Sequence, residues 1–309
     1  MNGCPRIGML LAVTLLSAAC GSSRPAVRAA DPQLSRDLEA ARAAHAQGLD
    51  AQAANLFDRA ADRAYLRDDL PAAMDAHYSR AICLMRLQRY DEAATELYRA
   101  EYAAQLADRP VDDNVIVLRA RVAYMRGELD EAKAQATRII DSPTAKPQAV
   151  SDAWAVVGLI AAARDDTEAT GDALRRMGEP ISPHGQAEHA RLSGMLANLE
   201  DRPDDAAQAF DREAELRRAT RAYATMARAL AAAAEAYEKL GRLDAAAVRY
   251  LRAGRSAAQQ SMPDEAERWL TQAARLADEA NDAATAAAAH EDLQRLGSEP
   301  GADPSTQPE

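Results

Sequence analysis

The segment GRLDAAAVRYLRA, residues 241–253, contains the pattern that decides the fold. Gly241 is followed five positions later by Ala246, then four positions later by the bulky Tyr250, and three positions later by the small Ala253. Positions that are three, four and seven apart share one face of an α-helix. The segment therefore predicts a helix break, followed by a helix that presents a small–bulky–small seam to its neighbour.

The same pattern recurs in seven copies at a nearly constant period. The break residues are Gly48, Gln88, Gly127, Asp165, Asp201, Gly241 and Asn281. The anchor residues that follow them are Ala53, Ala93, Ala132, Thr170, Ala206, Ala246 and Ala286, spaced 40, 39, 38, 36, 40 and 40 residues apart. The fourth copy, with Leu174 at the bulky position, is the weakest match. So steady a period indicates a repeat array.

Each period is long enough for two helices, one on either side of the break. We expect first helices at residues 76–87 and 220–240, and second helices at residues 90–106 and 243–260, for example. Each pair has an apolar side that it cannot bury alone, so consecutive pairs must stack. The sequence thus predicts an all-α protein, an α-solenoid of about seven helix-turn-helix repeats.

The composition disfavours several other classes of protein. Alanine, the strongest helix former, accounts for 76 of the 309 residues, whereas aromatic residues make up 4%. A β-sandwich, a barrel or a Rossmann domain would need more of the residues that form strands. The formal net charge of −11 argues against a broad nucleic-acid-binding surface, because such surfaces neutralise phosphates with Lys and Arg.

The repeats resemble the tetratricopeptide repeat family over about residues 34–297. Trp154, Val157 and Gly158 are similar to the family's W-x2-L-G signature, and Tyr237 stands at a matching position in the sixth copy. The usual period of this family is ~34 residues, so longer helices are needed here; HEAT and armadillo repeats, at ~40–47, are the rival assignment. Those repeats lack the Gly-type break followed by this Ala–aromatic–Ala spacing. The resemblance implies a right-handed superhelix whose first helices line a concave groove that grips a peptide or helix.

Carrying that groove over to this sequence gives candidate partner-binding residues in the second, third and fifth copies. Tyr, Met and Arg, which are enriched at the cores of interfaces, are frequent there. The candidates are Tyr78, Met85, Arg86, Asn114, Arg121, Tyr124, Met125, Arg191, Met195 and Asn198. The alternative for Met125 and Met195 is that they simply pack between neighbouring helices.

Residues 1–19 resemble the signal peptide of a bacterial lipoprotein. Arg6 precedes an apolar run at residues 7–16, too short to span a bilayer, and small residues lead to Cys20. The resemblance implies that Cys20 is lipidated, and Gly21 after it implies the outer membrane, with the protein facing the periplasm. The alternative is a secreted protein with a chance cysteine. We expect residues 20–33 to form a flexible tether and residues 298–309 a disordered tail.

No catalytic, metal-binding or cofactor-binding motif is recognisable. Gly-x-Ser-x-Gly, P-loop and His-Glu-x-x-His motifs are all lacking. His184 and His189 are five apart and do not share a helix face, and Cys83 in its apolar stretch is expected to be a buried small hydrophobe. The Asp pairs at 68–69, 112–113, 165–166 and 204–205 are expected to cap helices or favour their dipoles rather than bind metal. We therefore expect neither a metal nor a cofactor.

Together these features predict a non-enzymatic scaffold of the bacterial envelope. Anchored by lipid on Cys20, it would bind other envelope proteins in its groove, with no nucleic acid and no small-molecule cofactor. Two alternatives stay open. One is a carboxylate-dependent enzyme that acts on the cell wall, which would need two carboxylates about 5–9 Å apart in a pocket. The other is a structural spacer that self-associates end to end.

Overall fold

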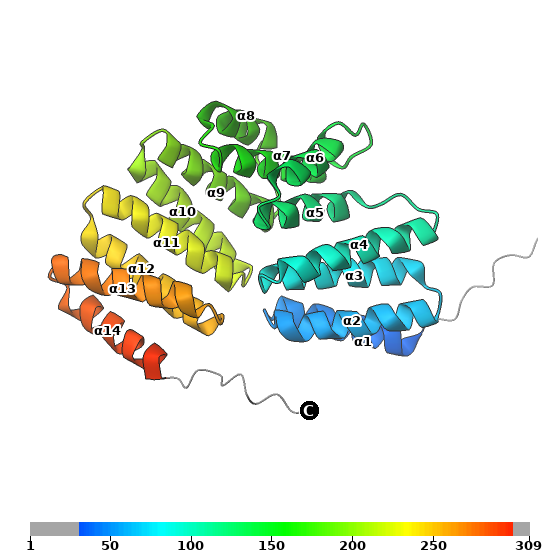
Figure 1. Ribbon diagram of the computed structural model, residues 1–309, viewed down its shortest axis with the longest axis horizontal. Helices are drawn as coiled ribbons and strands as arrows, with labels where there is room; N and C mark the ends of the chain where they lie inside the picture. Colours follow the sequence, from blue (N-terminus) through cyan, green and yellow to red (C-terminus); the bar gives the residue numbers. More distant parts are fainter. Residues whose placement is uncertain (1–30, 299–309) are drawn as a thin grey trace, which may run out of the picture.

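The computed structural model describes residues 31–298, and within this range the chain forms helices and no strands. The helices follow one another as seven pairs, which Figure 1 shows stacked along a curved path. The pairs are α1 (Pro32–Ala46) and α2 (Asp50–Leu66), α3 (Leu70–Arg86) and α4 (Tyr90–Leu106), α5 (Asp113–Met125) and α6 (Leu129–Ile140), α7 (Pro147–Ala162) and α8 (Thr167–Met177), α9 (Pro183–Leu199) and α10 (Pro203–Ala219), α11 (Tyr223–Lys239) and α12 (Leu243–Gln259), and α13 (Pro263–Glu279) and α14 (Ala283–Ser298).

Each helix packs mainly against the helices next to it in sequence. The buried apolar side chains accordingly form a series of clusters along the stack, from Leu34 at one end to Ala289 at the other, and no single central core among the described residues. This arrangement is expected when each pair can bury its apolar side only against its neighbours. The chain is therefore an α-solenoid of seven helix pairs, which confirms the predicted fold class.

The predicted break residues all adopt the left-handed backbone conformation that ends a helix. Their φ angles lie between 53° and 80°, including the four that are not glycine. At the first break, the residue after Gly48 donates its backbone N–H back to the carbonyl oxygen of Ala44, at 3.0 Å. This bond occupies a carbonyl that the helix itself leaves free. A residue that tolerates positive φ at these seven positions therefore fixes where each first helix stops.

The small–bulky–small seam is buried as the spacing predicts, except at Leu174 in the fourth copy and at His290 and Leu293 in the seventh. All seven anchors are 6% exposed or less, and the bulky residues are buried at Phe57, Leu97, Phe210 and Tyr250. In the fourth copy the adjacent Ala173 is buried and Leu174 only partly so. In the seventh copy His290 is exposed, because α14 is the last described helix and none follows to cover that face. The prediction was wrong at His290 for that reason.

Aspartates cap four helix starts, and three of these aspartates belong to the predicted Asp pairs. Their carboxylates accept hydrogen bonds from backbone N–H groups in the first turns of α1, α3, α5 and α8. These residues are Asp31, Asp69, Asp112 and Asp166. The remaining pair, Asp204 and Asp205, lies in the first turn of α10, where negative charge favours the helix dipole.

The array curls until its second half meets its first half. Arg221 Nη1, in the turn before α11, donates to the carbonyl oxygen of Ala46 at 2.7 Å, and Arg86 Nη2 donates to the carbonyl oxygen of Thr220 at 2.9 Å. Arg228 on α11 also bonds to Gln88, after α3. In Figure 1 the start of α11 accordingly lies beside the end of α3. The concave face is thereby enclosed at this point and does not run on as an open groove.

Several predictions concern residues outside the described range. Cys20, the signal peptide and most of the expected tether and tail belong to residues 1–30 and 299–309, so the lipidation stays a prediction. Among residues 31–298, no helix combines the length and the hydropathy needed to cross a membrane.

Candidate functional site

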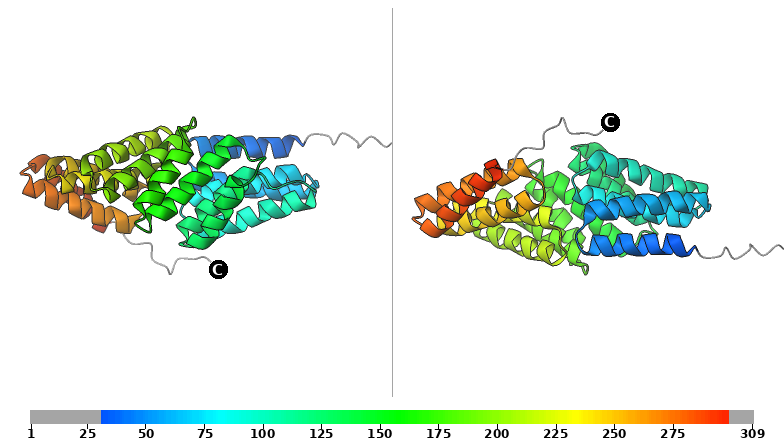
Figure 2. Two further views of the ribbon diagram at one scale, coloured as in Figure 1. Left: turned by 90° about the horizontal axis from the view of Figure 1, so that it is seen from above. Right: turned by 90° about the horizontal axis from the view of Figure 1, so that it is seen from below.

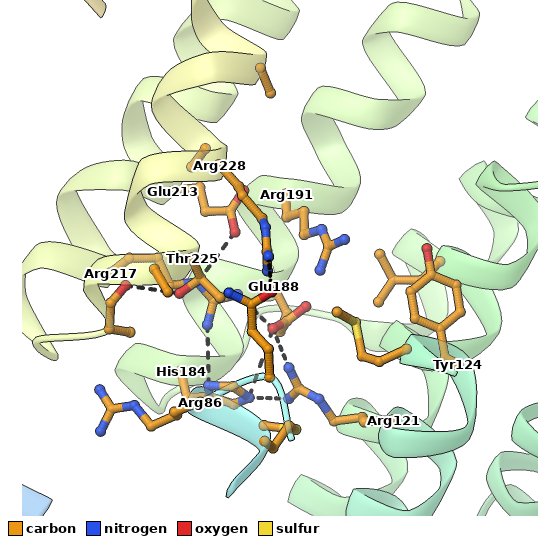
Figure 3. Close-up of a pocket in the computed structure, with 18 of the residues that line it drawn as sticks. Arg86, Arg121, Tyr124, His184, Glu188, Arg191, Glu213, Arg217, Thr225 and Arg228 are labelled. Carbon is orange, nitrogen blue, oxygen red and sulfur yellow. Dashed lines mark hydrogen bonds and ion pairs between the residues drawn. The ribbon is translucent and has the colours of Figure 1, made fainter. Parts of the chain in front are cut away.

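A cavity of about 540 Å³ lies on the concave side, where α3, α5, α7, α9, α10 and α11 converge (Figure 3). The first helices of six successive pairs contribute to its lining, from His45 on α1 to residues of α11, as the family resemblance implies for a groove. The closure between α3 and α11 adds Gln88 and Arg228 to the wall. The volume is in the range of pockets that take small molecules or short peptide segments.

Eight of the ten predicted groove residues line this pocket. They are Met85, Arg86, Arg121, Tyr124, Met125, Arg191, Met195 and Asn198. The other two do not. Tyr78 packs against the cluster between α3 and α5, where burial raises its pKa to about 12. Asn114 is exposed in the first turn of α5, where its backbone N–H donates to Asp112 at 2.9 Å.

One side of the pocket is apolar. Tyr124 and Met125 from α5, Leu159 from α7 and Phe210 from α10 contribute to it. Met195 from α9 lines the same wall and also packs against the cluster that contains Phe210. Met195 therefore lines the pocket and also packs between neighbouring helices, so both interpretations apply to it.

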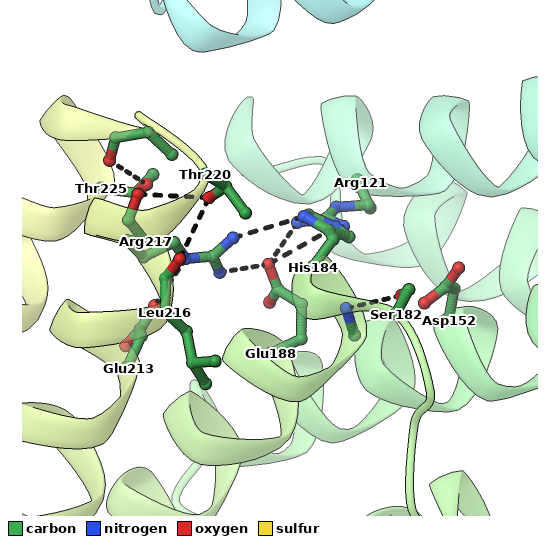
Figure 4. Close-up of polar contacts among 12 residues, drawn as sticks. Arg121, Asp152, Ser182, His184, Glu188, Glu213, Leu216, Arg217, Thr220 and Thr225 are labelled. Atoms are coloured by element: carbon green, nitrogen blue, oxygen red, sulfur yellow. Dashed lines mark hydrogen bonds and ion pairs between the residues drawn. The ribbon is translucent and has the colours of Figure 1, made fainter. Parts of the chain in front are cut away.

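The other side is a buried charge network centred on Glu188 (Figure 4). Glu188 Oε1 accepts a hydrogen bond from Arg217 Nη2 at 2.6 Å and a second from Arg121 Nη2. The side chain of Glu188 is 2% exposed and that of Arg217 is 4% exposed. Arg217 Nε donates in turn to Glu213 Oε1 at 3.2 Å. Helices α5, α9 and α10 are thus connected through one carboxylate.

The pKa values of the two carboxyl groups in this network, Glu188 and Glu213, are shifted in opposite directions. Burial alone would raise the pKa of Glu188, but the charges of Arg121 and Arg217 lower it well below its usual value. Among the described residues Glu213 has only Arg217 as a direct partner, and burial raises its pKa to about 7. Glu188 is therefore ionised at neutral pH, whereas Glu213 is close to half protonated.

His184, in the first turn of α9, lies between two guanidinium groups. Its Nε2 contacts Arg121 Nη1, and its Nδ1 is 3.4 Å from Arg217 Nη1. The charge of Arg121, followed by loss of hydration, lowers the pKa of His184 to about 3. The ring is therefore neutral, and a neutral imidazole has one acceptor nitrogen only.

The pocket carries an excess of positive charge although the chain as a whole is acidic. Five arginines and three glutamates line it: Arg86, Arg121, Arg191, Arg217, Arg228, Glu188, Glu213 and Glu235. Burial also raises the pKa of Glu235, so the glutamates balance even less of this charge. If all eight of these side chains were ionised, they would give the pocket a net charge of +2.

The guanidinium of Arg191 and the Oδ1 of Asn198 are among the lining groups that make no hydrogen bond within the described part of the chain, as is the second carboxylate oxygen of Glu188, Oε2. The guanidinium of Arg191, which Figure 3 shows among the lining side chains, acts on Glu188 and Glu213 only through its charge. The buried Oδ1 of Asn198 lacks a donor. Arg191, Met195 and Asn198 are four and three positions apart and share one face of α9. A hydrogen-bond donor, Arg191, and an acceptor, Asn198 Oδ1, thus border the apolar wall. They suit a ligand that carries both an acceptor group and a donor group.

A cluster of three potential metal ligands lies at the rim. His45 Nδ1 is 2.7 Å from Asp50 Oδ1 and 3.5 Å from Cys83 Sγ. Arg86 Nη1 is 3.4 Å from the same Asp50 oxygen, so a guanidinium already supplies positive charge there. Cys83 is fully buried, as predicted, and burial raises its thiol pKa to about 12, which opposes the thiolate that metal binding needs. The geometry therefore favours an ion pair over a metal centre.

Sequence reasoning missed His184, Glu188 and Arg217 as pocket residues, but it contained a signal for Glu213. Glu213 occupies the third seam position of the fifth copy, where the other copies have Ala, Ile, Met or Leu. A carboxylate at a position that the repeat buries must find a partner, because an isolated buried charge is costly. The partner, Arg217, lies one helical turn later.

No protein-family model and no curated protein matches this chain. Solved structures that resemble it in part include the C-terminal part of a TPR repeat-containing protein from Cytophaga hutchinsonii, with 17% identity, a TM-score of 0.40, and coverage of 84% of this chain and 95% of the other. The apo form of RapI has 11% identity and a TM-score of 0.49, covering 85% and 76%. A thermophilic TPR protein from Thermus thermophilus has 21% identity and a TM-score of 0.48, covering 65% and 98%. The assignment of the fold comes from the helix pairing described above.

Proposed function

We propose that this protein is a non-enzymatic adaptor of the bacterial envelope that holds a short segment of a partner protein in its central pocket. The observation that carries the proposal is an apolar wall bordered by the Arg191 guanidinium and the Asn198 Oδ1, neither of which hydrogen-bonds to any residue of the range 31–298. A peptide segment offers the matching groups: apolar side chains, a backbone N–H for the amide oxygen, and a carboxylate for the guanidinium.

The size of the pocket narrows the kind of segment. About 540 Å³ accommodates only a few residues, and the contacts between Arg86 and Thr220 and between Arg221 and Ala46 close the groove beside it. The ligand is therefore a short segment with an acidic group, rather than a long helix laid along an open groove.

The location in the envelope is the second part of the proposal. Lipid on Cys20 would anchor the protein to the outer membrane with the solenoid in the periplasm. The support is the lipobox-like sequence that precedes Cys20. Labelling cells with radioactive palmitate, in wild type and in Cys20→Ala, tests this part alone: label in the wild type that is absent from the variant is expected.

Photo-crosslinking in living cells tests the adaptor role. A crosslinking amino acid is placed at Met125 or Met195 on the pocket wall, and at the exposed Thr95 of α4 as the control. We expect the same envelope protein to be captured from both pocket positions and not from position 95. We also expect Arg191→Ala to abolish the capture. Identical products from all three positions would contradict the proposal.

A second candidate function, hydrolysis of a cell-wall polymer, is favoured by one observation. Glu188 and Glu213 contact the same guanidinium, and their pKa values are shifted in opposite directions, a pattern typical of acid–base pairs in active sites. Digestion of purified peptidoglycan by the wild type, lost in Glu213→Gln, would favour this enzyme over the adaptor. Both carboxylates are engaged by arginines, which is why we rank the adaptor first.

A further inference from the structure

The exposed apolar side chains of this protein are concentrated in one place. Among residues 31–298, eight large apolar residues are exposed, and five of them are on α2 and α4. These five, which we call the α2/α4 patch, are Tyr65, Leu66, Tyr98, Tyr102 and Leu106, with exposed fractions from 37% to 88%. A concentration of this kind on an otherwise polar surface indicates a contact surface.

The five residues form a continuous surface. Tyr98, Tyr102 and Leu106 are four positions apart and therefore share one face of α4. Tyr65 at the end of α2 lies close enough to Tyr102 for that phenol to add to the rise in its pKa, which is caused mainly by burial. Leu66 directly follows Tyr65 and is the most exposed of the five.

The patch is located where the chain enters the folded body. Asp31, the first described residue, forms an ion pair with Arg63 at 2.7 Å and approaches Arg67 to 3.8 Å. These two arginines flank Tyr65 and Leu66 in sequence. Figures 1 and 2 show the same relation: α1 begins at the end of the molecule where α2 ends, and α4 ends there too.

Chain length limits how far this end can be from a lipid on Cys20. Eleven residue steps separate Cys20 from Asp31, and a fully extended chain covers at most about 40 Å over that number of steps. Tyrosine settles at a membrane–water interface because its aromatic ring is amphipathic, and leucine adds apolar surface that can enter the boundary between headgroups and acyl chains.

We propose that the α2/α4 patch docks on the phospholipid surface to which Cys20 is anchored. The tyrosines and leucines enter the headgroup region and orient the solenoid against the membrane. This inference rests on the proposed lipid anchor and is independent of the partner that the pocket binds. The occupant is a bilayer, not a second protein.

The test measures the depth of a fluorescent label in the lipidated, full-length protein. Leu66→Cys carries the label, and Ile181→Cys is the matched control, because Ile181 is 90% exposed and lies between α8 and α9. Cys83 is fully buried and is not expected to react. The protein is reconstituted in vesicles of phosphatidylethanolamine and phosphatidylglycerol, with and without a lipid that carries a quenching nitroxide near the headgroup.

We expect strong quenching at position 66, none at position 181, and loss of the quenching at 66 in the double variant Tyr98→Asp, Tyr102→Asp. Equal quenching at both positions, or quenching that persists in the double variant, would overturn the docking. Vesicle flotation separates the two proposals. Protein that does not float overturns both the anchor and the docking, whereas protein that floats without quenching at position 66 overturns the docking alone.

Discussion

Replacing Glu188 with glutamine should destabilise the protein far more than a single isosteric change usually does. The side chain is 2% exposed and its Oε1 accepts hydrogen bonds from both Arg121 and Arg217. The amide of the variant would keep an acceptor oxygen, but the two guanidinium groups would lose the negative charge between them. His184, which is neutral, cannot replace that charge.

The structure sets the size of the effect. Removing one partner from a buried ion pair typically costs about 3–5 kcal/mol, because the other charge stays buried. Arg217 still has Glu213, whose pKa is raised in part by Glu188 and should fall when that charge is removed. Arg121 has no second carboxylate among its described contacts. This partial compensation places the expected loss at the lower end, about 3 kcal/mol.

Urea unfolding followed by circular dichroism measures the loss in the free energy of unfolding. The control is Glu200→Gln, an exposed carboxylate just after α9 that pairs with Arg202, where a change below about 0.5 kcal/mol is expected. The folded-state pKa of Glu188 is lowered, so its contribution is present above the unfolded-state pKa and declines in acid. The difference in unfolding free energy between Glu188→Gln and Glu200→Gln should therefore become smaller below about pH 4. Equal stabilities at pH 7 would refute the assignment of Glu188 as the centre of the network.

Three further predictions concern the breaks, the closure and Glu213. Gly127→Ala should cost about 1 kcal/mol of unfolding free energy because its φ is +78°, a conformation that alanine adopts with strain; space is not the cause, since no atom lies within 4 Å of an added Cβ. Asn281→Gly, at φ 58°, should be neutral or stabilising, and urea unfolding checks both. Arg86→Ala with Arg221→Ala should raise the radius of gyration in solution scattering without loss of helix signal, and an unchanged radius would contradict the closure. The pKa of Glu213 is raised to about 7, so the stability contributed by its protonated form is lost as pH rises from about 4.5 through 7. Glu213→Gln, which cannot ionise, should therefore be more stable than the wild type at pH 8, by up to about 3 kcal/mol. A series of urea unfolding midpoints at different pH values measures the difference.

The helix pairs could be predicted because their signals are local. A residue that tolerates positive φ, followed five positions later by Ala or Thr, marks all seven breaks, and these breaks are where the structure has them. The mistaken prediction at His290 also came from a local signal. His290 matches the spacing of the bulky position, but that position is buried only where a following helix covers it, which α14 lacks among the described helices.

The candidate site was predicted only in part. Residues on first helices, such as Tyr124 and Met195, followed from the repeat register and do line the pocket. Glu188 lies three positions before Arg191 and seven before Met195 on α9, so the same register contained a signal for it that the prediction did not use. Arg217 is on a second helix, α10, and could not be found from the register of the first helices. That Arg217 faces the pocket depends on which helices of other repeats lie opposite, and a single repeat does not contain that information.

The amino-acid sequence by itself determined that this chain is a stack of seven helix pairs, since each break, cap and seam depends on residues only three to seven positions apart. Only the tertiary structure decided that the stack closes on itself and encloses a positively charged pocket. The contacts that close it join residues 134 and 175 positions apart, Arg86 with Thr220 and Arg221 with Ala46. Their meeting depends on small rotations between successive pairs that add up along the solenoid, and no local pattern of residues specifies such a sum.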